Sequence, residues 1–522
     1  MTYSIVWFKR DLRLHDHLAL HNAVSQGKVL CLYVVEPSLW AQEDAANQHY
    51  QFLLESLREL YAALRQRGGQ LHVITGEVSE VFAQLFSHQP FKAIYSHEET
   101  GNAVTYERDK SVTRWCKQAQ IDWHEFAQFG VVRRLKNRDD WQRHWNVHND
   151  AACVPIPVLN AENFESLAPG LALPQLPASN QQLHLDPYDP PLRQRGGRLQ
   201  GVATLNDFLD ERCRQYRGGI SSPLSAPTAC SRLSPYLSYG CLSLREIVHA
   251  TRQQVSALTP QEEREKKGLN AFVSRLYWHC HFIQKLESEP ELEYRNLHRG
   301  YDGLREDDWN QAHFDALVSA RTGWPLVDAC VMMLHQTGWL NFRMRAMLVS
   351  VAAYPLWLDW RPVGQWLARQ FLDYEPGIHW SQMQMQSGTT GINIPRIYNP
   401  IKQARDHDPH GHFVRRWLPA MRRVPDTWLF EPWRMPPDVQ RACGVEVGVD
   451  IPMPVVDLES ATREAKARLF AVRGQPQVRA AKRAIVEKHG SRQGKNDRSG
   501  ATSQKKAASK VAPVAAQLEL DW

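Results

Sequence analysis

Residues 4–35 read SIVWFKRDLRLHDHLALHNAVSQGKVLCLYVV, and this stretch decides the fold of the first part of the chain. Two short apolar runs rich in β-branched residues, 4–8 and 29–35, flank a segment in which Leu, Ala and Val recur at helical spacing. Short apolar runs of this kind are typical of strands that are buried on both faces. The stretch therefore predicts a strand, a helix and a second strand.

The same alternation continues to about residue 130. Helical patterns and strand-like runs follow one another at residues 48–65, 71–76, 78–85, 92–97, 106–118 and 121–126. Strands that alternate with helices favour a parallel, doubly wound sheet. We therefore expect an α/β domain over residues 1–130.

The remainder of the chain is organised differently. Residues 131–200 are rich in Pro, Asn and Gln, which predicts an irregular connection between domains. Residues 201–487 have mainly helical periodicity and predict a large all-α domain, whose last helix is expected at 458–470. Residues 488–522 combine Gly, Ser, Lys and Ala, a composition that predicts a disordered basic tail.

The formal net charge of +6 is concentrated near the C-terminus. Residues 488–511 carry seven basic side chains against one acidic side chain, so the rest of the chain is formally neutral. Net charge alone therefore does not predict nucleic-acid binding by the globular part, where only a local basic patch could provide it.

Cysteine usage and hydropathy suggest a compartment. The nine cysteines are scattered without a C-x-x-C motif, and the N-terminus lacks the apolar core of a signal peptide. No apolar run is long enough to cross a bilayer. These features predict a cytoplasmic protein with reduced thiols. They also predict no metal site, since the neighbours His279, Cys280 and His281 would point in different directions on a helix.

Three segments of the helical part predict a binding site. In ACSRLSPYLSYGCLS (229–243), hydroxyl and guanidinium donors at Ser231, Arg232 and Ser234 precede Pro235, where a helix can begin. Such donors suit a bound phosphate, although a plain helix cap is the alternative.

The other two segments, 321–345 and 357–377, are rich in tryptophan and contain Arg345 and Asp373. Charged side chains in aromatic surroundings must be paired or must face a polar ligand. A buried flat cofactor with hydrogen-bonding edges would satisfy both residues.

These motifs resemble those of the photolyase/cryptochrome family, in the same order, over roughly residues 1–435. The similar segments are VWFKRDLRLHDHLAL (6–20), CSRLSPYLSYGCLS (230–243), TGWPLVDACVMMLHQTGWLNFRMR (322–345), LDWRPVGQWLARQFLDYEP (358–376) and RIYNPIKQARDHDPHGHFVRRWLP (396–419). The resemblance implies a monomer with U-shaped FAD in the α domain. It also implies an optional antenna chromophore of the folate or deazaflavin type in the α/β domain, and damaged DNA as partner.

Site residues follow from the resemblance residue by residue. Ser231, Arg232, Leu233 and Ser234 match the diphosphate clasp, with Tyr216 as the nearest candidate for the tyrosine ahead of it. Further cofactor contacts are expected from Arg275, Arg345, Asp373 and Glu375. Of these, Arg345 and Asp373 match the pair beside the isoalloxazine ring, where Arg345 would stabilise the anionic reduced flavin.

The chain also departs from the family pattern. On the helix expected to line the substrate cavity, Ala271 and Ser274 stand at the positions assigned to a Glu and a Trp, and Trp278 follows one turn later. The asparagine of another flavin-binding helix is replaced by Phe342. We therefore expect an atypical subgroup.

Residues 374–391, YEPGIHWSQMQMQSGTTG, alternate Gln and Met between turn-forming residues. Read alone, the stretch predicts a surface loop; with the resemblance, it predicts a cofactor-facing turn with His379 near flavin N5. Ser381 and Met383 occupy the positions of the family's W-Q-W motif, so Trp380 is the candidate inner tryptophan for electron transfer. Trp360 matches the middle tryptophan, and Trp309 lies near the outer position.

Two functions follow as alternatives. The leading one is blue-light-driven, FAD-dependent repair of pyrimidine photoproducts in DNA; the other is a cryptochrome-like photoreceptor without repair activity.

The C-terminal peptide QLELDW, from Gln517 to Trp522, resembles peptides that bind the bacterial sliding clamp. Folding of this end back onto its own domain is the alternative.

Overall fold

The computed structural model describes residues 3–171, 177–392 and 394–490. Its first part is a five-stranded parallel sheet of strand order β3-β2-β1-β4-β5. The strands are β1 (Ser4–Phe8), β2 (Val29–Val35), β3 (Leu71–Thr75), β4 (Ala93–His97) and β5 (Asp122–Phe126). The helices of this part are α1 (Leu18–Ser25), α2 (Pro37–Trp40), α3 (Asn47–Arg65), α4 (Val78–His88), α5 (Ala103–Ala119) and α6 (Trp141–Asp150). The predicted doubly wound α/β fold is confirmed.

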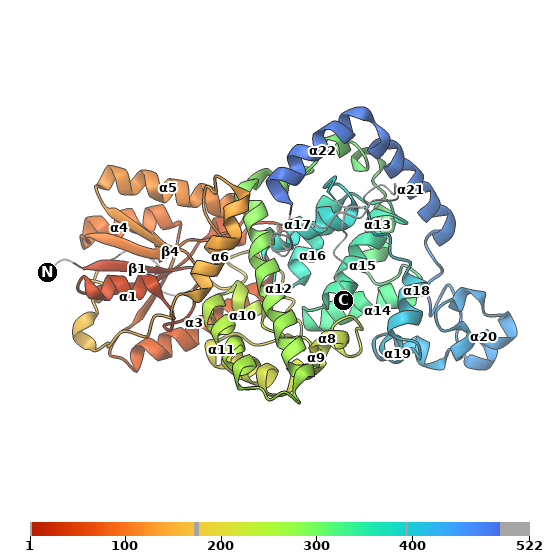
Figure 1. The fold of residues 1–522 in the computed structure, drawn as a ribbon, viewed down its shortest axis with the longest axis horizontal. Coiled ribbons are helices and arrows are strands. Elements are labelled where there is room, and N and C mark those ends of the chain that lie inside the picture. Colours follow the sequence, from red (N-terminus) through yellow and green to blue (C-terminus); the bar gives the residue numbers. More distant parts are fainter. Residues whose placement is uncertain (1–2, 172–176, 393, 491–522) are drawn as a thin grey trace, which may run out of the picture.

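Helices cover both faces of the sheet (Figure 1). Alternate side chains of β1 explain this arrangement: Val6 and Phe8 belong to the core formed with α1 and α3, whereas Ile5 and Trp7 pack with α4 and α5. All five residues of β1 are buried, and the four after Ser4 are apolar, so the strand does not alternate between apolar and polar residues.

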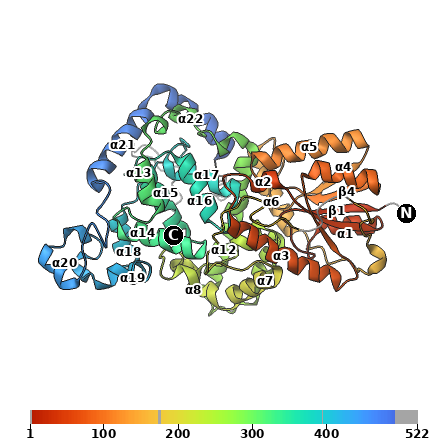
Figure 2. The ribbon, with the colours of Figure 1, turned by 180° about the vertical axis from the view of Figure 1, so that it is seen from behind.

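The second part is almost entirely helical and lies beside the α/β part in both ribbon views (Figures 1 and 2). The long helix α12 (Glu263–Ser288) runs along the boundary and packs against α8 (Cys213–Gly219) and α17 (Pro376–Ser387). The remaining helices are α7 (Arg198–Asp207), α8 (Cys213–Gly219), α9 (Ala226–Ala229), α10 (Ser234–Ser238), α11 (Leu244–Ala257), α13 (Gln311–Val318), α14 (Pro325–Thr337), α15 (Phe342–Ala353), α16 (Trp360–Gln370), α17 (Pro376–Ser387), α18 (Pro400–His407), α19 (His412–Trp417), α20 (Pro437–Cys443), α21 (Leu458–Gly474) and α22 (Pro476–His489).

The prediction of a turn at residues 374–391 is wrong, because α17 occupies this stretch. Pro376 stands in the first turn of the helix, where its missing N–H is not needed, and Gly388 ends the helix with a φ of +79°. The residues that resemble turn punctuation therefore mark the two ends of a buried helix.

The C-terminal part contains more helix than expected. The predicted helix at 458–470 is present as α21, and α22 extends the ordered structure to His489, so residues 488 and 489 do not belong to a disordered tail. The rest of the predicted tail from residue 491 onward, including Gln517 to Trp522, lies outside the described residues.

The loop after β1 is fixed by a buried polar network. Asp11 accepts hydrogen bonds from the backbone N–H of Lys9 and from His97 Nδ1, both at 2.7 Å, and its Oδ2 lies 3.0 Å from His17 Nε2. His17 Nδ1 in turn accepts from the N–H of Leu20 at the start of α1. Asp11, His17 and His97 form the one group of potential metal ligands found in the described ranges, and their separations are those of hydrogen bonds.

All nine cysteines are unpaired thiols, in agreement with their scattered positions. Among the described helices, none has both the length and the apolar character required to span a membrane.

Candidate functional site

Two adjoining hollows in the helical part form one continuous site, which we call the flavin cavity. One hollow of about 770 Å³ lies between α15 and α17, and the other, of about 1010 Å³, extends toward α8 and α12. They share lining residues, including Ser234, Arg345 and Asp373. The site therefore brings together segments that are up to about 170 residues apart in the sequence, from Tyr216 to Gln386.

The start of α10 supplies donors to this cavity. Ser231, Arg232 and Ser234 line it, whereas Leu233 is buried in the hydrophobic core and does not line it. Arg232 adopts a left-handed φ of +62°, and its guanidinium lies 3.7 Å from the ring centroid of Trp339.

Arg232 is a cation that needs an anionic partner. Burial lowers its pKa to about 10, so the side chain remains charged at neutral pH. Within the described part of the chain, Arg232 forms no ion pair. A diphosphate beside Ser231 and Ser234 would supply the missing negative charge, so these residues fit the phosphate end of FAD.

The expected pair of Arg345 and Asp373 is present at the centre of the cavity. Arg345 Nη2 donates to Asp373 Oδ2 at 3.0 Å, and Arg345 Nε donates to the carbonyl of Leu340 at 2.6 Å. Asp373 Oδ1 is buried and accepts no hydrogen bond from the described residues. An N–H on the edge of a bound flavin ring would satisfy this oxygen, so the pair fits the isoalloxazine end of FAD.

Glu375 and His379 line the same cavity from the start of α17. Burial raises the pKa of Glu375 to about 7, and the nearby Arg10 guanidinium, 3.6 Å away, opposes the rise. Burial lowers the pKa of His379 to about 4, so its ring is neutral and its Nε2–H donates to the carbonyl of Gly364 at 2.8 Å. The Nδ1 atom of His379 is therefore an acceptor.

One stripe of α12 lines the outer part of the cavity. Arg275, Trp278, His279 and Phe282 recur at helical spacing and all face it, together with Tyr216 from α8. Ala271 and Ser274, which stand at the positions that the resemblance assigns to a Glu and a Trp, do not line the cavity. Trp278, one helical turn after Ser274, supplies an aromatic surface there.

Trp360 and Trp380 lie behind the cavity and do not line it. Their ring centroids are 5.9 Å apart at an interplanar angle of 65°. Of the residues described, Trp380 is the one whose ring contacts Trp360, and the predicted outer member Trp309 instead packs against Phe314 at 5.2 Å. The structure thus joins two of the three predicted tryptophans.

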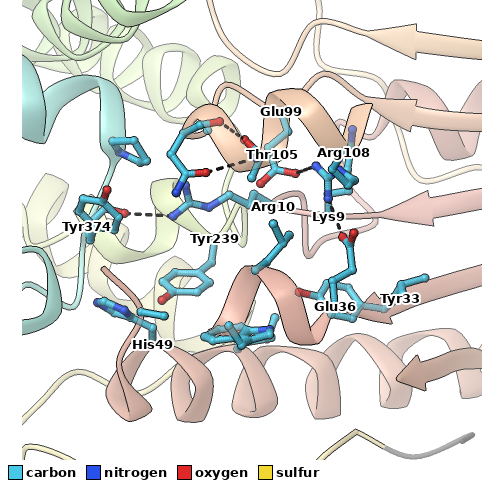
Figure 3. A pocket seen from close by; sticks show the side chains of 18 of the residues that line it. Lys9, Arg10, Tyr33, Glu36, His49, Glu99, Thr105, Arg108, Tyr239 and Tyr374 are labelled. Carbon is cyan, nitrogen blue, oxygen red and sulfur yellow. Dashed lines mark hydrogen bonds and ion pairs between the residues drawn. The ribbon is translucent and has the colours of Figure 1, made fainter. Parts of the chain in front are cut away.

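A second hollow of about 940 Å³, which we call the edge cavity, lies at the carboxyl ends of the strands (Figure 3). The chain places β2 on one side of β1 and β4 on the other, and such a switch in strand order opens a crevice for ligands. Residues that directly follow these strands, Lys9, Arg10, Glu36 and Glu99, line it. The position of these charged residues directly after the predicted strands is a sequence signal for a ligand site at this edge of the sheet.

Several charged groups stand among the mainly apolar and aromatic residues that line the edge cavity. Arg108 donates to Glu36 at 2.7 Å, to Asp109 at 2.9 Å and to Glu99. Burial raises the pKa of Glu36 to about 7, although Arg108 opposes the rise. From the opposite wall, Arg10 reaches toward the helical part and donates to the carbonyl of Tyr374 at 3.0 Å (Figure 3).

Comparisons with known proteins agree with both halves of this arrangement. Residues 4–135 match the family model described as DNA photolyase, and residues 272–471 match the model described as the FAD binding domain of DNA photolyase. A cryptochrome DASH from Gloeobacter violaceus is 28% identical over 91% of this chain and 99% of its own length. A deoxyribodipyrimidine photo-lyase from Escherichia coli is 27% identical over 91% of this chain and 99% of its own.

Solved structures give the same result. A bacterial class III photolyase from Agrobacterium tumefaciens superposes with a TM-score of 0.78 at 26% identity, over 91% of this chain and 98% of that one. An archaeal photolyase from Sulfolobus tokodaii, described with two FAD molecules, has the same fold with a TM-score of 0.71 at 24% identity, over 90% of this chain and 100% of that one. The chain belongs to the photolyase/cryptochrome family, and its helical part is the FAD-binding domain of that family.

Proposed function

We propose that the protein repairs a pyrimidine photoproduct in DNA by blue-light-driven electron transfer from reduced FAD. The observation that carries this proposal is the stripe of Arg275, Trp278 and Phe282, which continues the flavin cavity outward. The rings of Trp278 and Phe282 are tilted by 31° with centroids 5.8 Å apart. Such aromatic faces suit bases that have been turned out of a duplex.

Arg275 distinguishes this cavity from one that recognises a lesion through a carboxylate. A guanidinium donates hydrogen bonds and cannot accept them, so it would contact the carbonyl oxygens of pyrimidine bases and not their N–H groups. FAD, once bound and reduced, supplies the electron for lesion cleavage and regains it afterwards. The chain's own residues would stack on the bases of the lesion and exclude water. Arg345 would stabilise the negative charge of the reduced cofactor.

The test uses oligonucleotides that carry a cyclobutane dimer, a (6–4) product or no lesion. We expect blue light and the reduced yellow protein to restore normal bases in one lesion class. Trp278→Ala should weaken binding of that damaged strand by about 1–3 kcal/mol through loss of base stacking. Trp309→Ala, which removes a tryptophan that does not line the cavity, is the matched control.

Persistence of both lesions, in a protein whose FAD is photoreduced normally, would favour the second candidate, a photoreceptor without repair activity. The family contains members of both kinds, including cryptochromes that match this chain over most of its length. The observation that keeps this alternative is that Ala271 stands at the position that the resemblance assigns to a lesion-contacting carboxylate.

We further propose that the edge cavity holds the second, light-harvesting chromophore. Its position at the strand ends suits a planar ligand with polar edges, and Lys9 Nζ is a buried cation that makes no hydrogen bond in the described chain and lies 3.9 Å from Glu125. Ala45→Trp, which fills the cavity from one wall, should abolish binding of an added folate or deazaflavin chromophore and leave FAD bound. Equal chromophore binding by the wild type and this variant would contradict the assignment.

A sliding-clamp contact through residues 517–522 stays a prediction.

A further inference from the structure

Residues 371–376 form the wall that separates the flavin cavity from the edge cavity. Phe371 lines the first, Pro376 lines the second, and Tyr374 lines both. Tyr374 stands between Asp373 and Glu375, which both face the flavin cavity. Tyr374 therefore borders the flavin cavity directly, without another side chain between them.

The carboxylate of Asp44 is a proton acceptor for the hydroxyl of Tyr374. It donates to Asp44 Oδ2 at 2.6 Å, a short distance that is typical of a charge-assisted O–H···O⁻ hydrogen bond. The same Asp44 oxygen accepts from Asn102 Nδ2 at 3.1 Å, which holds the carboxylate in place. Figure 3 shows Tyr374 at the boundary of the cavity, opposite the residues of the sheet edge.

Tyr374 also belongs to the aromatic group behind the flavin cavity. Its ring centroid lies 5.2 Å from that of His379 in an edge-on arrangement, and His379 lies 4.8 Å from Trp380. Burial and then Asp44 raise the pKa of Tyr374 well above its usual value, while the neighbouring indole of Trp380 acts in the opposite direction. Tyr374 is therefore a neutral phenol before any reaction.

We propose that Tyr374 is an electron donor to the flavin cavity and that Asp44 takes its phenolic proton. In this step the phenol gives one electron to photoexcited, oxidised FAD and its O–H bond breaks. The proton forms a new O–H bond on Asp44 Oδ2, which leaves a neutral tyrosyl radical and a neutral carboxylic acid. Return of the electron from the flavin to the tyrosyl radical, and of the proton from Asp44 to the phenolic oxygen, restores both groups. The step rests on the light-driven function proposed above.

Other tyrosines do not meet both requirements. Tyr239 lines the edge cavity but donates to no carboxylate among the described residues, and it does not line the flavin cavity. Tyr106 donates to Glu287 but lines neither cavity. The combination of a position at the cofactor and a carboxylate on the hydroxyl distinguishes Tyr374.

The inference is tested by illuminating the oxidised, FAD-loaded protein and recording electron paramagnetic resonance and transient absorption. We expect a neutral tyrosyl radical in the wild type and loss of its signal in Tyr374→Phe, which keeps the ring and removes the hydroxyl. Asp44→Asn, which can accept the hydrogen bond but not the proton, should lower the radical yield by about 100-fold, a usual contribution of a positioned base. Tyr239→Phe is the matched control and should keep the full signal.

The outcomes separate this inference from the proposed function. Wild-type photoreduction of FAD that is accompanied by tryptophanyl radicals alone would overturn the role of Tyr374 and leave the light-driven function intact. The same result follows if Tyr374→Phe, with FAD bound, retains the tyrosyl signal. Absence of FAD photoreduction in the wild type would overturn the light-driven function, and the inference with it.

Discussion

Replacement of Arg345 by Met is expected to lower the reduction potential of bound FAD by roughly 100 mV. The variant keeps most of the side-chain volume but removes a positive charge from the centre of the flavin cavity. The family resemblance implies that the reduced cofactor is anionic, so loss of this charge destabilises the reduced form more than the oxidised one. Breaking a fully buried ion pair costs about 3–5 kcal/mol.

The geometry sets the size of this effect. Asp373 is 6% exposed but Arg345 is 23% exposed, so solvent screens part of the interaction. We therefore expect about half of the fully buried value, or about 2 kcal/mol, which corresponds to roughly 100 mV for a one-electron step. The Arg345 guanidinium also lies 4.1 Å from the ring centroid of Phe371, and Met at this position preserves that packing.

The potential is measured by equilibrium reduction of the FAD-loaded protein against a reference dye. Arg369→Met is the matched control, because Arg369 pairs with Asp186 at the surface and lines neither part of the flavin cavity. An unchanged potential in Arg345→Met would show that the Arg345–Asp373 pair does not face the ring.

The α/β part was predictable because its signals are local. Apart from Ser4, the runs that form β1 and β2 do not alternate between apolar and polar residues, which is typical of strands covered on both faces. The ion pair of Arg345 and Asp373 was predictable for a different reason, since two opposite charges in aromatic surroundings must find each other or a ligand.

The register of α12 could not be read in the same way. Ala271 and Ser274, the positions that the resemblance assigns to a Glu and a Trp, lie four residues before Arg275 and Trp278, which line the cavity. Four residues are close to one helical turn, so both pairs lie on the same helix face and share its hydrophobic pattern. Only the three-dimensional position of the cavity shows which turn of α12 lines it.

The helix α17 was missed because its ends resemble a loop. Proline and glycine break helices when they stand inside them, but Pro376 and Gly388 stand at the two boundaries, where they begin and end the helix.

The edge cavity was missed because its lining residues come from the ends of separate strands. No single segment contains the site, and only the strand order brings it together.

Replacement of Trp360 by Phe is expected to slow photoreduction of oxidised FAD by about tenfold or more, the change that about 1.4 kcal/mol of added barrier produces. Trp360 is 2% exposed and contacts Trp380 through its ring, so it is placed to pass an electron toward the cavity. Its Nε1–H donates to Asn296 Oδ1 at 2.8 Å, which stabilises the indole when it loses an electron. Phenylalanine has no such donor and is much harder to oxidise.

FAD binding should survive this change, because Trp360 lines neither part of the flavin cavity. The rate is measured from the loss of oxidised flavin absorbance under steady blue light with an external reductant, at equal FAD content. Trp366→Phe, in a partly buried tryptophan whose ring contacts are Phe314 and His335, is the control. A residual rate that disappears in the double variant Trp360→Phe, Tyr374→Phe would show two parallel donors. An unchanged rate in Trp360→Phe would show that electrons bypass the Trp360–Trp380 pair, and the wall between the two cavities would then be the main route.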